Sequence, residues 1–138
     1  MESTPTQLGD GPARSPRRLL IIDDELPILD LLKLYFEENG FQVSLAADSK
    51  GGLKSLRADK PDLVILDIVL RDEDGLKLLP QIKEIRPDTK VVMVTGMGYP
   101  PDLLQEALHR GADGYVAKGS ALLFDLLRTV RSLLAQDP

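Results

Sequence analysis

Residues 61–68 read Pro-Asp-Leu-Val-Ile-Leu-Asp-Ile, in which the apolar run 63–66 is followed directly by Asp67. Residues 19–22 and 91–94 form two further runs that are apolar throughout. Strands covered on both faces have this composition, whereas strands with one face in water alternate apolar and polar residues. Residues 42–46 and 114–117 are weaker strand candidates, placed where the alternation of strands and helices requires them. The chain is therefore expected to form five strands.

Segments with helical periodicity follow each strand candidate. Ser49 and Asp74 are the expected caps of the second and third helices, and Pro80 predicts a late start or a kink in the third. The fourth helix is expected over 101–110, and the fifth follows Ser120. The apolar stripes are Ile28, Leu31, Leu32, Tyr35 and Phe36; Leu53 and Leu56; Leu78, Leu79, Ile82 and Ile85; Leu103, Leu104, Ala107 and Leu108; and Leu123, Leu126, Leu127, Val130 and Leu134.

The alternation of strands and helices decides the fold class. At this spacing it implies parallel β-α-β units joined by right-handed crossovers. The expected fold is α/β, a doubly wound five-stranded parallel sheet with five helices on both faces. With 138 residues the chain is long enough for one buried core and too short for two ordinary domains. Residues 1–17 are rich in Ser, Thr, Pro and Gly, which predicts a flexible leader before a domain over 18–136.

Composition excludes several classes of function. The net charge of −5 and the scattered basic residues argue against direct binding of nucleic acid. No apolar stretch approaches the roughly 20 residues that span a bilayer, so a cytoplasmic protein without a membrane contact is expected. The chain has no cysteine and a single histidine, so any metal must be held by oxygen.

Reactive side chains stand at the carboxyl ends of four strand candidates: Asp23 and Asp24, Asp67, Thr95, and Lys118. An isolated aspartate at such a place is usually a helix cap or a turn residue. In a parallel sheet, however, the strand ends open onto one crevice, where these groups should converge. Three adjacent carboxylates repel one another, and a divalent cation such as Mg²⁺ would neutralise them together with Lys118. Such a site suits a phosphoryl group.

Four motifs carry a family resemblance. Residues 19–25 (Leu-Leu-Ile-Ile-Asp-Asp-Glu), 61–68, 91–96 (Val-Val-Met-Val-Thr-Gly) and 111–118 (Gly-Ala-Asp-Gly-Tyr-Val-Ala-Lys) resemble the receiver domains of two-component response regulators. The similarity extends over about residues 18–136. It implies the flavodoxin-like strand order 2-1-3-4-5 and a phosphoacceptor signalling domain rather than an enzyme with a separate substrate.

The resemblance also implies a role for each site residue. Asp67 matches the phosphoacceptor, which attacks the phosphorus of a phosphohistidine. Mg²⁺ would be bound directly by Asp24, Asp67 and the carbonyl of Val69, and through water by Asp23. Lys118 matches the lysine that pairs with a phosphoryl oxygen.

A second group of residues matches the family's switch. Thr95 matches the hydroxyl that hydrogen-bonds the new phosphoryl group, and Tyr115 matches the aromatic residue that turns inward behind it. The face formed by the fourth helix, fifth strand and fifth helix would then change shape for partner binding. The implied partners are a sensor histidine kinase or a histidine-phosphotransfer protein, and a downstream output domain or protein. Whether the same face forms a homodimer is left open.

Two residues depart from the family pattern. Gly119 replaces the proline that usually follows the lysine through a cis bond, so the 118–119 peptide is expected to be trans. Arg71 replaces a proline that is common after the phosphoacceptor, which could alter the mobility of that loop or reach an acidic partner. These departures motivate an alternative: a phosphorylation-independent pseudo-receiver that acts as an interaction module. An aspartate phosphatase is disfavoured by Val69, where such enzymes need a second acid, and a flavin-binding protein by Asp23 and Asp24.

Overall fold

The computed structural model describes residues 16–96 and 100–135. The predicted leader, residues 1–17, lies outside these ranges except for its last two residues, so its flexibility stays a prediction. None of the helices in the described ranges is long and apolar enough to cross a membrane.

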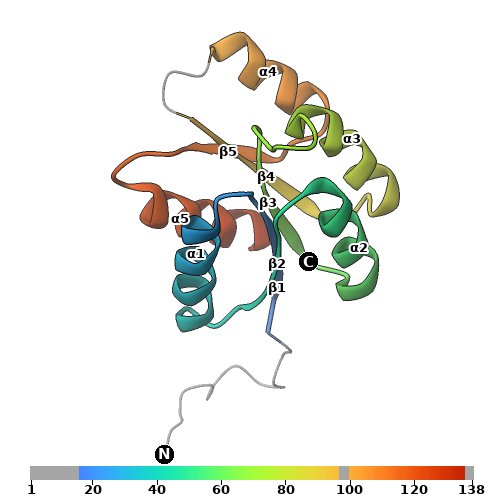
Figure 1. Ribbon diagram of the computed structural model, residues 1–138. Helices are drawn as coiled ribbons and strands as arrows, with labels where there is room; N and C mark the ends of the chain where they lie inside the picture. The colour runs from blue at the N-terminus through green and yellow to red at the C-terminus, as the bar shows by residue number, and fades with distance from the viewer. Residues whose placement is uncertain (1–15, 97–99, 136–138) are drawn as a thin grey trace, which may run out of the picture.

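Five parallel strands form one sheet in the order β2-β1-β3-β4-β5 (Figure 1). This order confirms the prediction, and the two weak strand candidates are real strands. All five run in the same direction, so their carboxyl ends lie along one edge of the sheet. The strands are β1 (Arg18–Ile22), β2 (Gln42–Ala46), β3 (Leu63–Asp67), β4 (Lys90–Thr95) and β5 (Gly114–Ala117).

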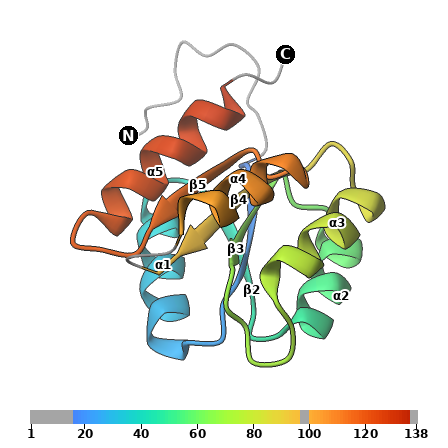
Figure 2. The same cartoon turned by 90° about the horizontal axis from the view of Figure 1, so that it is seen from above.

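Five helices cover the two faces of the sheet. In the view of Figure 2, α1 and α5 lie on one side of the sheet, and α2 and α3 lie on the other. Side chains of α4 join the same apolar cluster as α2 and α3. The helices are α1 (Leu26–Glu38), α2 (Ser49–Asp59), α3 (Gly75–Ile85), α4 (Pro101–His109) and α5 (Leu122–Leu134).

The strands divide the core into two layers because successive side chains of a strand point to opposite faces. Leu19 and Ile21 of β1 belong to the cluster with α1 and α5. Leu20 and Ile22 belong to the cluster with α2 and α3. Each of the four is essentially inaccessible to solvent, and burial of one such side chain contributes about 1.5 to 3 kcal/mol. This double burial explains why the run in β1 is apolar at every position.

The caps of α2 and α3 differ in how well the sequence predicts them. Asp74 caps α3 as expected, because its carboxylate accepts a hydrogen bond of 2.9 Å from the Leu76 N–H. The expectation that Ser49 caps α2 is wrong. Asp48 is the cap, and its carboxylate accepts from the Gly51 N–H at 2.7 Å. Ser49 is the first helical residue, and its hydroxyl is used elsewhere.

Pro80 lies inside α3, which begins at Gly75, so the predicted late start is wrong. A proline has no N–H, and the carbonyl four residues earlier therefore loses its helical partner. That carbonyl belongs to Leu76, and it accepts a hydrogen bond of 3.0 Å from the Arg110 guanidinium instead. The helix tolerates the proline because a side chain from the end of α4 replaces the missing donor.

The apolar stripe predicted for α4 is only partly buried. Ala107 is fully buried, but Leu103 and Leu108 are each 38% exposed, which contradicts the expectation that both are core residues. This helix is short and lies near β5, the last strand of the sheet, where less apolar surface is available to cover it. The residue spacing predicts the helix correctly but cannot report how much surface lies beneath it.

Gly75 lies where the start of α3 packs closely against the end of β3. A Cβ atom at this position would lie 2.4 Å from the Asp67 carbonyl oxygen and 2.8 Å from Ile68 Cα, both backbone atoms. We therefore expect Gly75→Ala to lower the free energy of unfolding by about 2 kcal/mol, measured by urea denaturation. Gly114→Ala is the control because its Cβ would make ordinary contacts at 3.5 Å or more. Equal stability of the two variants would contradict the close packing of Gly75.

Candidate functional site

Carboxylates from two strand ends meet at the carboxyl edge of the sheet. Asp23 follows β1 and Asp67 ends β3, and both are buried, with 3% and 4% of their surface exposed. Oxygen atoms of Asp23, Glu25 and Asp67 all lie within 4.8 Å of one another. We call these three residues the acidic cluster.

Lys118, which follows β5, supplies the positive charge of the site. Its Nζ lies 3.0 Å from Asp67 Oδ2, 2.7 Å from Glu25 Oε1 and 3.6 Å from Asp23 Oδ2. Burial alone would lower the pKa of Lys118, but the hydrogen bonds to Glu25 and Asp67 raise it above the ordinary value. One ammonium group therefore forms ion pairs with three carboxylates and stays charged.

Ionisation of Asp23 is disfavoured by its burial and, to a smaller extent, by the charge of Asp67. Burial, opposed by a hydrogen bond of 2.8 Å from the Glu25 N–H, raises the pKa of Asp23 to about 6, and the nearby charge of Asp67 adds to this effect. The ordinary value is 3.8. A proton or a cation at Asp23 is therefore favourable.

Asp24 lies apart from the acidic cluster but lines the same crevice. Its Oδ2 is 3.7 Å from the Arg71 Nε, and its side chain is 17% exposed. The crevice has a volume of about 360 Å³. It is lined by Asp24, Glu25, Asp67, Val69, Leu70, Arg71, Gly96 and Lys118. Asp24 thus lines the crevice at the strand ends, as the sequence predicts. The carboxylate that lies beside Asp23 and Asp67, however, is that of Glu25 and not that of Asp24.

Glu25 is the site residue that the sequence analysis missed. It is the third acid of the Asp-Asp-Glu motif at residues 23–25, and this run was the available signal. Glu25 lies just before α1, and its position in the sequence alone does not distinguish it from an ordinary surface carboxylate. Its contact with Lys118 comes from a residue 93 positions away, which no local pattern could predict.

Val69, Thr95 and Tyr115 occupy three different environments. The Val69 N–H donates to Asp67 Oδ1 at 3.1 Å, while its side chain is 65% exposed. Thr95 is buried, and its carbonyl accepts a hydrogen bond of 2.7 Å from the Lys118 N–H. Tyr115 on β5 is 43% exposed. The described backbone contains no cis peptide bond, so the 118–119 peptide is trans, as Gly119 predicted.

The loop between β3 and α3 is fixed at both ends. The Gly75 N–H donates to the Ile68 carbonyl at 2.7 Å. In the middle of the loop, the Asp72 carboxylate accepts from the Ser49 hydroxyl at 2.6 Å and from the Ser49 N–H at 3.1 Å. These hydrogen bonds, the hydroxyl first, lower the pKa of Asp72. The start of α2 therefore holds the loop that borders the crevice.

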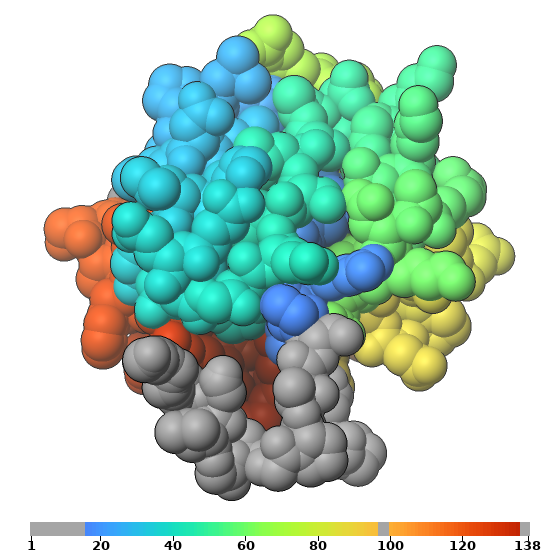
Figure 3. Space-filling view, turned by 90° about the horizontal axis from the view of Figure 1, so that it is seen from below, coloured from blue at the N-terminus to red at the C-terminus, as the bar shows by residue number. Residues whose placement is uncertain are grey.

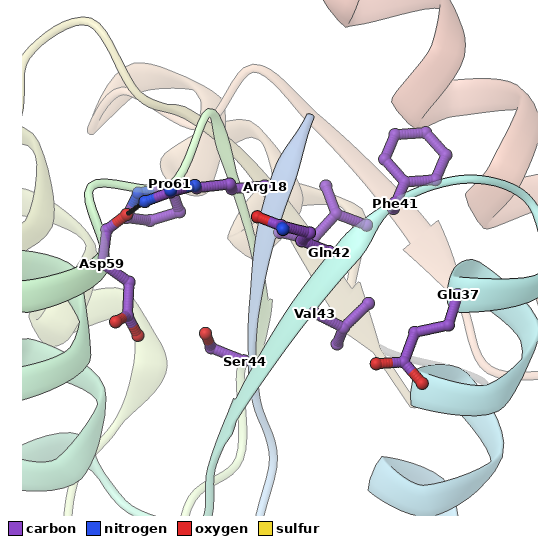
Figure 4. A pocket seen from close by; sticks show the side chains of 9 residues that line it. Arg18, Glu37, Phe41, Gln42, Val43, Ser44, Asp59 and Pro61 are labelled. Carbon is purple, nitrogen blue, oxygen red and sulfur yellow. Dashed lines mark hydrogen bonds between the residues drawn. The ribbon is translucent and has the colours of Figure 1, made fainter. Parts of the chain in front are cut away.

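A larger hollow of about 590 Å³ lies at the opposite end of the sheet, around the start of β1 and β2 (Figure 4). Figure 3 views this end, where the start of β1, in blue, reaches the surface between the cyan and green segments. Arg18 in this hollow already donates to the Asp59 carbonyl at 2.9 Å. No predicted site residue lines it. Size alone therefore does not identify the functional site, whereas the converging charges do.

Comparison with known proteins identifies the family. The family model described as the response regulator receiver domain matches residues 19–128. The chain belongs to this family. Among solved structures, it is similar to a response regulator receiver domain protein (CheY-like) from Methanospirillum hungatei, with a TM-score of 0.82 and 34% identity over 88% of this chain and 96% of the other.

Curated relatives of this receiver domain are longer proteins. It is 32% identical to the response regulator MprA of Mycolicibacterium vanbaalenii over 86% of this chain and 51% of the relative. It is 35% identical to the phosphate regulon transcriptional regulatory protein PhoB of Escherichia coli over 74% of this chain and 45% of the relative. The chain therefore spans about half the length of these relatives.

The donor set of this receiver domain fits a hard divalent cation. The acidic cluster and Asp24 contribute four negative charges, and Lys118 and Arg71 contribute two positive charges. Two negative charges remain, and Mg²⁺ cancels that excess while preferring carboxylate and carbonyl oxygens. The resemblance implies Asp23, Asp24, Asp67 and the Val69 carbonyl as the groups that would hold it, whereas the carboxylates that lie together in the structure are those of Asp23, Glu25 and Asp67.

The raised pKa of Asp23 makes the stability of the metal-free protein depend on pH. Because the folded state holds this proton more tightly, its contribution is present below about pH 4 and is lost as the pH rises through about 6. We expect Asp23→Asn, without divalent cations at about pH 7, to raise the free energy of unfolding by about 1 to 2 kcal/mol. Urea denaturation across this pH range measures it.

Asp72→Asn is the matched control for this experiment. The pKa of Asp72 is lowered, so its contribution is present above its ordinary pKa and is lost as the pH falls. We expect this variant to be less stable than the wild type at about pH 7, the opposite sign. Destabilisation by Asp23→Asn in the absence of metal would contradict the expectation that burial of the ionised Asp23 carboxylate lowers stability.

Proposed function

We propose that this receiver domain accepts a phosphoryl group on Asp67, in a Mg²⁺-dependent reaction, from a phosphohistidine of a sensor kinase or phosphotransfer protein. The observation that carries this proposal is the position of Asp67. Its buried carboxylate contacts Lys118 at 3.0 Å and borders an open crevice. A buried aspartate that only supported the fold would not need an ammonium group and an open face together. A cytoplasmic location beside the kinase follows from this proposal.

The proposed reaction uses the groups at the strand ends. A carboxylate oxygen of Asp67 forms a bond to phosphorus while the phosphorus–nitrogen bond breaks, and the imidazole leaves with the electron pair. Bound Mg²⁺ would neutralise charge on the phosphoryl oxygens. Lys118 exchanges its contact with Asp67 for one with a phosphoryl oxygen. The Val69 N–H, 3.1 Å from Asp67 Oδ1, holds the carboxylate in place.

The proposed switch connects the phosphoryl group to the face formed by α4, β5 and α5. Phosphorylation replaces one negative charge by about −1.5 to −2 and adds acceptor oxygens. Thr95 ends β4 directly after Val94, the β4 partner of Asp67, so its backbone lies beside the strand end that would carry the phosphoryl group. Tyr115, now 43% exposed, would turn inward after Thr95 moves. This change would alter binding of a downstream output domain or protein.

Phosphoryl acceptance can be tested with a small-molecule donor. Incubation with acetyl phosphate and Mg²⁺ should add the mass of one phosphoryl group to the wild type, as detected by intact-protein mass spectrometry. Asp67→Asn should abolish the addition because an amide is not a nucleophile for this reaction. Asp74→Asn is the control, since asparagine caps a helix as well as aspartate does. Equal labelling of the Asp67→Asn protein would contradict the assignment.

The alternative function, a phosphorylation-independent interaction module, is supported by the contact between Arg71 and Asp24, because a cation already occupies part of the crevice. Addition of beryllofluoride and Mg²⁺ separates the two functions. For the proposed function, amide resonances of Asp67, Thr95 and Tyr115 should shift. In Thr95→Ala, the shift at Tyr115 should fall below about half of the wild-type value, while the shift at Asp67 persists. An unchanged wild-type spectrum would favour the interaction module.

A further inference from the structure

Arg71 is the cation that the structure places beside Asp24. The Arg71 Nε lies 3.7 Å from Asp24 Oδ2, and both residues line the crevice of the acidic cluster. Lys118 contacts each member of the acidic cluster. Lys118 therefore pairs with the acidic cluster, and Arg71 pairs with Asp24.

The loop that carries Arg71 is held over the crevice by its neighbour. Asp72 accepts two hydrogen bonds from Ser49 at the start of α2. Gly75, at the other end of the loop, is fixed against the backbone of β3. Arg71 is 84% exposed at its side chain, so its guanidinium reaches Asp24 from the solvent side of the crevice. The anchored backbone keeps it within reach of Asp24 without burying it.

We infer that Arg71 competes with Mg²⁺ for Asp24 and so weakens the affinity of this receiver domain for the metal. The inference rests on the proposed Mg²⁺-dependent function. Mg²⁺ at Asp24 needs a low local positive potential, and the guanidinium of Arg71, 3.7 Å from the carboxylate, raises that potential. Metal binding therefore displaces Arg71 from Asp24 or proceeds against its charge. In either case part of the binding free energy is lost.

The expected effect is modest because the contact is exposed and solvent screens it. An exposed ion pair of this kind changes an equilibrium constant by about two- to fivefold. Removal of the guanidinium should therefore tighten Mg²⁺ binding by that factor. High ionic strength should reduce the difference, since it screens an exposed pair more than a buried one.

Titration of the metal-free protein with Mg²⁺ alone tests the inference, by calorimetry and by amide resonances of the crevice. We expect Arg71→Gln to lower the Kd by about two- to fivefold at low ionic strength. Arg71→Lys, which keeps the charge, should stay closer to the wild type. Arg128→Gln is the matched control, because Arg128 is also exposed and pairs with Asp125 at 3.4 Å on α5, outside the crevice. It removes the same charge and should leave the Kd nearly unchanged.

Two results would overturn the inference in different ways. If Arg71→Gln and Arg128→Gln bind Mg²⁺ equally, or if Arg71→Gln binds it more weakly, Arg71 does not compete for Asp24 while the proposed function stands. If neither the wild type nor any variant binds Mg²⁺, the proposed function fails and the inference fails with it. Amide resonances of residues 68–74 should move during the wild-type titration, since the loop carries the displaced side chain.

Discussion

The structure depends on the electrostatic contact between Lys118 and the buried carboxylates of Asp23 and Asp67. Two unpaired carboxylates at such a distance would repel by several kcal/mol at an effective dielectric near 20. A single ammonium group offsets much of this energy, yet burial, with a smaller contribution from the charge of Asp67, still raises the pKa of Asp23 to about 6. The site thus carries an excess of negative charge that Lys118 and Arg71 do not neutralise. Burial of the Asp23 carboxylate, together with the smaller repulsion from Asp67, is the physical reason that a divalent cation is favourable here.

The parallel sheet makes this contact feasible. Asp23, Asp67 and Lys118 come from segments far apart in the sequence, and only a common strand direction brings their backbone positions to one edge. The apolar layers on the two faces supply the free energy that holds the charges together, since the repulsion is small against burial of the strand residues. The backbone contact between Lys118 and Thr95 then fixes the end of β5 against β4. Stability and function are therefore provided by different parts of the same strands.

The fold could be predicted from the sequence because its signals are local and repeated. Apolar runs and helical stripes report burial over several residues, and they locate the strands and the helices. The motif residues Asp23, Asp67, Thr95 and Lys118 could be placed at the carboxyl edge of the sheet from strand direction alone. Side-chain partners could not be predicted in this way. Ser49 has the composition of a cap, but its hydroxyl donates to Asp72, which is 23 residues away.

Side-chain partners also decide the conformation of the loop between β3 and α3, and local sequence patterns do not reveal them. The sequence identifies Arg71 as unusual but cannot tell a mobile loop from a fixed one. The answer depends on Asp72, whose carboxylate docks on α2, and on Gly75, where any side chain would meet the backbone of β3. Because neither anchor involves the side chain of Arg71, the guanidinium can move without unfolding the loop. An exposed side chain on an anchored loop can yield to a metal ion at little cost in packing, whereas a buried arginine could not.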